Sequence, residues 1–165
     1  MSETTLKGAI AEAAIALAAT ELGFVVLRPL TEGRRYDLII DTGPRLLRVQ
    51  CKWGRRQGNV VVVKTSTQRL TPAGYVGTTY HADEIDGIAV YCEELKRCFY
   101  LPIEIAAGRR VFHLRLAPAA NNQELAINWA AHHEFGAIAQ LGERRAGSAK
   151  VVGSSPTSST STRPS

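Results

Sequence analysis

The stretches Arg35-Tyr-Asp-Leu-Ile-Ile40 and Leu46-Leu-Arg-Val-Gln-Cys-Lys-Trp53 decide how this chain of 165 residues folds. Each is rich in apolar and β-branched residues, and a Thr-Gly-Pro turn separates them, so together they predict a β-hairpin. Because side chains alternate between the faces of a strand, Gln50 and Lys52 share one face, and the paired strand brings Asp37 beside them. The two stretches therefore predict a carboxylate, an amide and an ammonium in one place.

Strand signals continue on both sides of this hairpin. Short apolar runs alternate with Gly, Pro, Asp and Asn, which predicts a meander of antiparallel strands. The expected strands are 24–27, 36–40, 46–53, 60–64, 88–92, 98–101 and 111–116, with a turn at 54–59. The stretch 66–80, which carries several Thr and Gly residues, predicts an exposed loop.

A helix is expected near each end of this series. The first spans 5–22, is capped by Thr4 or Thr5, stops at Gly23, and has an apolar stripe made of Leu6, Ile10, Ala14 and Leu17. The second spans 121–134, with Asn121 or Asn122 as its cap. The order of elements, a helix, a series of strands and a second helix, predicts an α/β fold.

Glu12 is the one charged residue between Lys7 and Glu21, and small apolar residues surround it. A carboxylate in such an environment carries a desolvation cost, which a metal ion or the ammonium of Lys52 would offset. The alternative is that Glu12 is an ordinary exposed helix residue. Because its neighbours are small and apolar, we place Glu12 in the candidate site.

Hydrolysis of a phosphodiester needs a hard cation held by oxygen atoms, a water acidified by it, and positive charge near the reacting phosphate. Asp37, Gln50 and the carbonyl of Cys51 are candidate ligands for Mg²⁺ or Mn²⁺, and Glu12 would complete the set. Lys52 would orient the water or stabilise charge. The alternatives are a strand-edge acid for Asp37 and a lysine that only extends from a sheet edge for Lys52.

Positive charge is concentrated in one part of the chain. The formal net charge is +5, yet residues 28–69 alone carry ten Lys and Arg against three acids, a balance of +7. Scattered charge usually forms a solvated face, whereas this clustering favours a nucleic acid partner. The candidate DNA-binding residues are Arg34, Arg35, Arg55, Arg56, Lys64, Ser66 and Arg69.

Motifs throughout residues 5–135 combine into a recognisable pattern. They are Lys7-Gly8 with Glu12, Arg35-Tyr-Asp37, Gln50-Cys-Lys52, Asp86 ahead of Ala89-Val-Tyr91, Leu101-Pro-Ile103, and Leu114-Arg-Leu116 through Asn121-Asn-Gln123. This pattern resembles the PD-(D/E)xK endonuclease family, and within it the intron-encoded homing endonuclease branch. The chain departs from the family at Gln50, where an acid is usual, although the homing branch also tolerates Gln.

The resemblance implies a restriction-endonuclease-like α/β fold, with a mixed central sheet flanked by helices. The same resemblance implies a magnesium-dependent, site-specific endonuclease of a mobile element that cuts double-stranded DNA. It also implies products with 5′-phosphate and 3′-hydroxyl ends. Because two strands must be cut, a homodimer or homotetramer is expected. Two alternatives are a Holliday-junction resolvase-like nuclease and a catalytically inactive DNA-binding protein of the same fold, of which Gln50 would be the sign.

Composition excludes several classes of protein. Hydrophobic residues make up 45% and charged residues 21%, so a wholly disordered chain and a coiled coil are excluded. No apolar run approaches the ~20 residues that cross a bilayer. The first residues lack the features of a secretory signal, and the cysteines, Cys51, Cys92 and Cys98, form no CxxC pair. These features predict a cytoplasmic protein with reduced thiols, no membrane segment and no zinc site.

The end of the chain differs in composition from the rest. We expect residues 1–135 to form the nuclease domain and 136–165, rich in Gly, Ala and Ser, to form a disordered tail. Ala139-Gln-Leu-Gly-Glu-Arg144 and Val152-Gly-Ser-Ser-Pro-Thr157 are also what the D-arm and T-arm of a bacterial tRNA gene would encode. We infer that the reading frame runs through a tRNA gene, and that truncation after Phe135 leaves stability and DNA affinity nearly unchanged at physiological salt.

Overall fold

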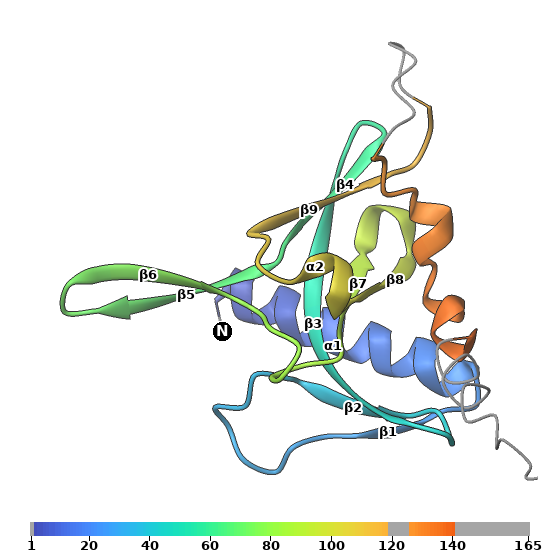
Figure 1. The fold of residues 1–165 in the computed structure, drawn as a ribbon, viewed down its shortest axis with the longest axis horizontal. Coiled ribbons are helices and arrows are strands. Elements are labelled where there is room, and N and C mark those ends of the chain that lie inside the picture. Colours follow the sequence, from blue (N-terminus) through green and yellow to red (C-terminus); the bar gives the residue numbers. More distant parts are fainter. Residues whose placement is uncertain (1, 119–125, 141–165) are drawn as a thin grey trace, which may run out of the picture.

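A computed structural model describes residues 2–118 and 126–140 of the chain. The described residues form a seven-stranded mixed sheet, a separate two-stranded hairpin, one long helix and several short helical turns (Figure 1). The strands of the large sheet are β1 (Val25–Leu27), β2 (Leu38–Asp41), β3 (Leu46–Gln57), β4 (Val60–Lys64), β7 (Gly87–Cys92), β8 (Arg97–Pro102) and β9 (Val111–Arg115). The family resemblance and the α/β expectation agree with this architecture.

Strand β3 organises the sheet because three strands pair with it. It is antiparallel to β2 and β4 and parallel to β7. The expected turn at 54–59 is too long, since β3 continues to Gln57 and only Gly58 and Asn59 form the turn. Gly54 is needed for close packing instead: a Cβ atom there would lie 2.8 Å from side-chain carbons of both Val61 and Val90.

Helix α1 (Glu3–Glu21) covers one face of the sheet. Its buried residues are Ala11, Ile15 and Ala19, which recur every four residues. Ile15 and Ala19 pack in one core with strand residues such as Leu38 and Val49. The expected stripe was wrong, because Leu17 is 61% exposed; small alanines on the buried face let the helix approach the sheet closely. The cap also differs, since the hydroxyl of Ser2 accepts the N–H of Thr5.

The opposite face of the sheet carries a second core. Phe99, Phe112 and Val90 are fully buried there, and the segment from Tyr80 to Ile85 and helix α2 (Ile103–Ala106) pack against it. One sheet thus separates two apolar cores. Because each face is covered, positions on β3 that remain accessible stand out as candidate sites of chemistry.

Strands β5 (Ser66–Thr71) and β6 (Gly74–Thr79) pair with each other as a separate hairpin. The hairpin projects from the body of the molecule (Figure 1). The expectation of a loop at 66–80 was wrong: Thr and Val favour strands, and hydrogen bonding between the two strands outweighs the loop signal from Gly. The hairpin adds a two-stranded arm beside the candidate site.

The described part of the C-terminal region contains no long helix at 126–134, although one was expected; residues 121–125 lie outside the described residues. Trp129 instead bridges to Arg115, and two 3₁₀ turns follow, η2 (Ala130–His133) and η3 (Phe135–Ala137). Ile138 is fully buried in the core beneath α1. Ile138, which belongs to the expected tail, thus contributes to the core; the domain limits stay a prediction, and the remainder of the expected tail, 141–165, lies outside the described residues.

Short 3₁₀ turn η1 (Glu93–Leu95) links β7 to β8 and completes the described elements. Among these elements, none has both the length and the apolar composition that a membrane-spanning helix requires.

Candidate active site

Asp37 stands directly before β2 and is tied to β3 through both its backbone and its side chain. Its N–H donates to the carbonyl of Val49 at 2.9 Å, and its Oδ2 accepts the N–H of Cys51 at 2.8 Å. Burial raises the pKa of the Asp37 carboxyl, against the hydrogen bonds from Cys51 and Gln50 and the positive charges of Lys52 and Arg28, which lower it. The carboxylate is thus held in place at an electrostatic cost.

The amide of Gln50 lies between two oxygen atoms. Its Nε2 donates to Asp37 Oδ2, and also to the carbonyl oxygen of Cys51 at 3.4 Å. A polarised N–H therefore occupies the point on which the carboxylate and the carbonyl converge. Burial raises the pKa of the Cys51 thiol, so this residue offers its carbonyl rather than a thiolate.

Lys52 lies on the same face of β3 as Gln50, as strand alternation predicts. Its Nζ lies 5.2 Å from the ring centroid of Tyr80. Burial lowers the pKa of the Lys52 ammonium, and the neighbouring charge of Arg35 lowers it further, while Asp37 acts in the opposite direction. The two β-strands therefore bring an acid and an amine to one side of the sheet.

Glu12 reaches the same region from α1. Its Oε2 accepts a hydrogen bond from Arg28 Nη2 at 2.7 Å, and the two form an ion pair. Burial raises the pKa of Glu12, and the nearby charge of Asp37 raises it further. A cavity of about 430 Å³ is lined by Glu12, Arg28 and Asp37, with the loop 29–36 forming the rest of its wall.

The donor atoms gathered around Asp37 suit a hard divalent cation. Within residues 2–118 and 126–140, no cluster of three or more His, Cys, Asp or Glu side chains forms a metal site. Two carboxylates, an amide and a main-chain carbonyl do gather, and all of them can present oxygen, which Mg²⁺ prefers. Glu12 and Asp37 repel each other, so a cation between them would relieve the repulsion.

The candidate DNA-binding residues divide into two groups, one beside the candidate site and one farther along β3. Arg34 is exposed and lines the cavity, Lys64 ends β4 close enough to lower the pKa of Lys52, and Ser66 and Arg69 belong to β5. Arg55 and Arg56 are exposed but lie three and four residues beyond Lys52 on β3, about 10–13 Å along the strand.

Arg35 belongs to neither group, because its guanidinium forms hydrogen bonds with other groups of the protein. Nε and Nη2 donate to the Glu84 carboxylate at 3.0 and 3.4 Å, and Nη2 also donates to the Thr79 carbonyl at 2.9 Å. Nη1 donates to the hydroxyls of Thr67 and Thr78 at 3.2 and 3.4 Å. These bonds account for all five N–H donors of the side chain. In this structure Arg35 therefore fastens the β5–β6 hairpin, and its expected contact with DNA stays a prediction.

Two residues of the site were not identified from the sequence. Arg28 was counted only within the basic segment, and Tyr80 was placed in an exposed loop although it is 1% exposed. Aromatic residues within a loop-like stretch are a weak sign of burial. No local pattern could link Arg28 to Glu12, because the helix and the strand end meet only in the folded chain.

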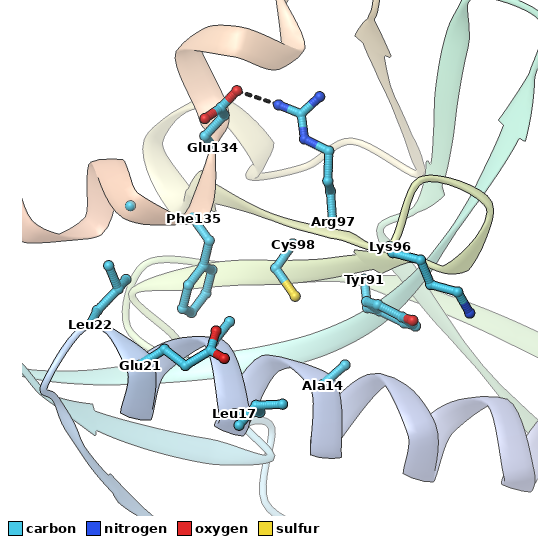
Figure 2. A pocket seen from close by; sticks show the side chains of 12 residues that line it. Ala14, Leu17, Glu21, Leu22, Tyr91, Lys96, Arg97, Cys98, Glu134 and Phe135 are labelled. Carbon is cyan, nitrogen blue, oxygen red and sulfur yellow. Dashed lines mark hydrogen bonds and ion pairs between the residues drawn. The ribbon is translucent and has the colours of Figure 1, made fainter.

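A second cavity, of about 510 Å³, lies between the C-terminal half of α1 and β8 (Figure 2). Leu17, Cys98 and Phe135 line it, and an ion pair between Arg97 and Glu134 lies at its side. None of the candidate catalytic residues lines this cavity, so the chemistry is assigned to the Glu12 and Asp37 region.

Comparison with known proteins identifies the family of the chain. The family model for PD-(D/E)XK endonucleases matches residues 2–136. A search of curated proteins finds no significant match. Among solved structures, the bacterial homing endonuclease I-Ssp6803I is similar, with 24% sequence identity, a TM-score of 0.73, and coverage of 91% of this chain and all of that chain.

The family model covers most of the chain, and the structural similarity independently supports the same fold. The matched region includes both strands of the Asp37 hairpin, the helix that bears Glu12, and the sheet that supports them. The chain therefore belongs to the PD-(D/E)XK endonuclease family and is a DNA endonuclease.

Proposed function

We propose that this endonuclease hydrolyses double-stranded DNA site-specifically, using Mg²⁺ or Mn²⁺ bound by Asp37, Glu12, Gln50 and the Cys51 carbonyl. The observation that carries the proposal is the convergence of Asp37 Oδ2 and the Cys51 carbonyl on the amide of Gln50. Rotation of that amide would exchange its N–H for its oxygen and present a third oxygen ligand.

Each side chain has a distinct task in this mechanism. When bound, the cation supplies Lewis acidity at the scissile phosphate. Lys52 orients the attacking water or stabilises the charge that develops on the phosphate, and its lowered pKa favours proton exchange with that water. Arg34, which lines the cavity, and Lys64, whose charge acts on Lys52, neutralise neighbouring phosphates.

Nicking of a supercoiled plasmid tests the catalytic assignment. With Mg²⁺, Asp37→Asn and Lys52→Met are expected to reduce the rate by about 10²-fold or more, because each removes a charge at the reacting centre. Asp41→Asn is the matched control, since its carboxylate accepts the N–H of Gly43 at the β2–β3 turn and belongs to no part of the proposed site. Unchanged nicking in Asp37→Asn and Lys52→Met would refute the assignment.

We also propose that the enzyme assembles as a homodimer or homotetramer, because cutting both strands requires two active sites. Sedimentation analysis of the full chain with a cleaved duplex is expected to show an even number of copies. A monomer that makes double-strand cuts in one binding event would contradict this.

A role in a mobile element is the third part of the proposal. It is supported by the description of the similar structure as a bacterial homing endonuclease. Selection of cleaved sites from a randomised duplex library is expected to recover one long target. Preferential cleavage of immobile four-way junctions over any linear duplex would instead identify a junction-resolving enzyme.

A further inference from the structure

Tyr80 occupies an unusual position beside the candidate active site. It follows β6 directly and is 1% exposed. Among the residues that the structure describes, its hydroxyl is the buried side-chain polar atom without a hydrogen-bond partner. Burying a hydroxyl without a hydrogen bond costs free energy of folding. The role of Tyr80 at this position therefore rests on its aromatic ring.

Two cations contact this ring. The Arg35 guanidinium lies 4.5 Å from the ring centroid, and Lys52 Nζ lies 5.2 Å from it. Both distances fall within the range of about 6 Å in which a cation is attracted to an aromatic face. The ring attracts both positive charges, and this attraction lowers the free-energy cost of placing Arg35 and Lys52 close together.

The two cations differ in how firmly they are held. Arg35 has hydrogen bonds from all five of its donors, to Glu84 and to the β5–β6 hairpin. Lys52 has four rotatable bonds, and its ammonium is adjacent to the ring rather than to a fixed acceptor. Arg35 thus fixes the ring, and the ring in turn limits where the lysine can go.

The segment after Tyr80 is also fastened. Arg48 donates to the Asp86 carboxylate and to the carbonyls of Ala82 and Asp83. These bonds join residues 82–86 to β3, the strand that carries Lys52. The ring is consequently attached to the same rigid element as the side chain that it contacts.

We propose that the ring of Tyr80, clamped by Arg35, is a positioning residue that holds the Lys52 ammonium in the active site. The inference rests on the proposed catalytic function of Lys52. Since the hydroxyl has no partner, the ring alone is required, and phenylalanine serves equally well at this position.

A measurement on the metal-free native protein tests the contact without any need for cleavage. Ring current from Tyr80 is expected to move the Lys52 Hε proton resonances upfield of those of the other lysines, and Lys52→Met identifies the signal by its loss. Tyr80→Phe keeps the upfield shift, and Tyr80→Leu abolishes it. Ordinary Lys52 shifts in the native protein overturn the proposal, even where Tyr80→Leu fails to fold.

Kinetics test the consequence for catalysis. Tyr80→Phe retains native kcat, whereas Tyr80→Leu lowers kcat about tenfold with little change in KM for DNA, a loss equal to one cation–aromatic contact. Phe112→Leu is the matched control, because Phe112 is also a buried ring with a cation, Arg109, 5.4 Å away, but it lies on β9. Equal kcat losses in Tyr80→Leu and Phe112→Leu would show a merely structural role.

The two sets of outcomes separate this inference from the proposed function. If the native protein cleaves no DNA but the Lys52 resonances are shifted by the ring, the contact stands and the catalytic assignment fails. If Lys52→Met abolishes nicking while Tyr80→Leu folds and keeps full kcat, the assignment stands and the positioning role is refuted.

Discussion

The carboxylates of Asp37 and Glu12 are held where their charge is costly. Burial raises the pKa of each, and their mutual repulsion raises that of Glu12 further. The ordinary pKa values of these groups are 3.8 for Asp37 and 4.5 for Glu12. At pH values between the ordinary pKa and the raised pKa of each group, the folded protein therefore binds more protons than the unfolded chain. The resulting stabilisation is complete below the ordinary values and is lost as pH rises through the raised values.

Asp37→Asn is expected to raise the melting temperature of the metal-free protein at neutral pH by about 2–4 °C, because a neutral amide avoids this cost. The gain should disappear below the ordinary pKa of 3.8, where the native carboxyl is also neutral. Thermal denaturation in EDTA over a pH series measures it, with Asp41→Asn as control. A lower melting temperature at neutral pH would show that the charge itself is stabilising.

Gln50→Glu should have opposite effects on stability and on metal binding. A third carboxylate would face Asp37 where an N–H now donates, which destabilises the metal-free protein by about 1–3 kcal/mol. The added charge should tighten Mg²⁺ binding. Denaturant unfolding in EDTA and calorimetric titration with Mg²⁺ measure the two effects. Unchanged Mg²⁺ affinity would place the cation elsewhere.

At the scale of elements, the β5–β6 hairpin depends on one side chain from outside it. The hairpin forms its own small sheet, separate from the large one. Arg35 connects it to the body through Thr67, Thr78, Thr79 and Glu84. The orientation of the arm relative to the active site therefore rests on these contacts.

Arg35→Ala is expected to loosen this arm. Loss of five hydrogen bonds, two of them to a charged partner, should lower the free energy of unfolding by about 2–3 kcal/mol and speed amide exchange in residues 66–79. Arg34→Ala, at the exposed neighbouring position, should change neither quantity. Hydrogen exchange read by mass spectrometry is the measurement, and unchanged protection at 66–79 would show that the hairpin is stable alone.

Across the whole molecule, one sheet supports two cores, and the C-terminal segment returns to close the core beneath α1. Phe135 and Ile138 pack there with Ile15 from the opposite end of the chain. The core is thus completed in part by Ile138, a residue that the composition of the sequence assigned to a tail. The contribution of Phe135 and Ile138 is apolar burial, which involves no ionisable group and so does not depend on the titration of these side chains.

Ile138→Ala should destabilise the protein by about 2–4 kcal/mol, as removal of a fully buried side chain leaves a cavity. Leu17→Ala is the matched control; its side chain is 61% exposed and should cost little. Denaturant unfolding compares the two variants. Equal effects would mean that the segment after Phe135 contributes no more than surface residues, as the sequence had suggested.

The sequence by itself determined the strands of the large sheet, although not those of the β5–β6 hairpin, and the shared face of Gln50 and Lys52, because both follow from the two-residue period of a single strand. It also determined that Asp37 lies beside them, since a short turn limits how two strands can pair. Only the tertiary structure decided that Arg35 bonds inward, that Tyr80 contacts Lys52, and that Ile138 is buried. These contacts join residues far apart in the chain, and no local pattern of charge or hydrophobicity encodes which distant groups meet.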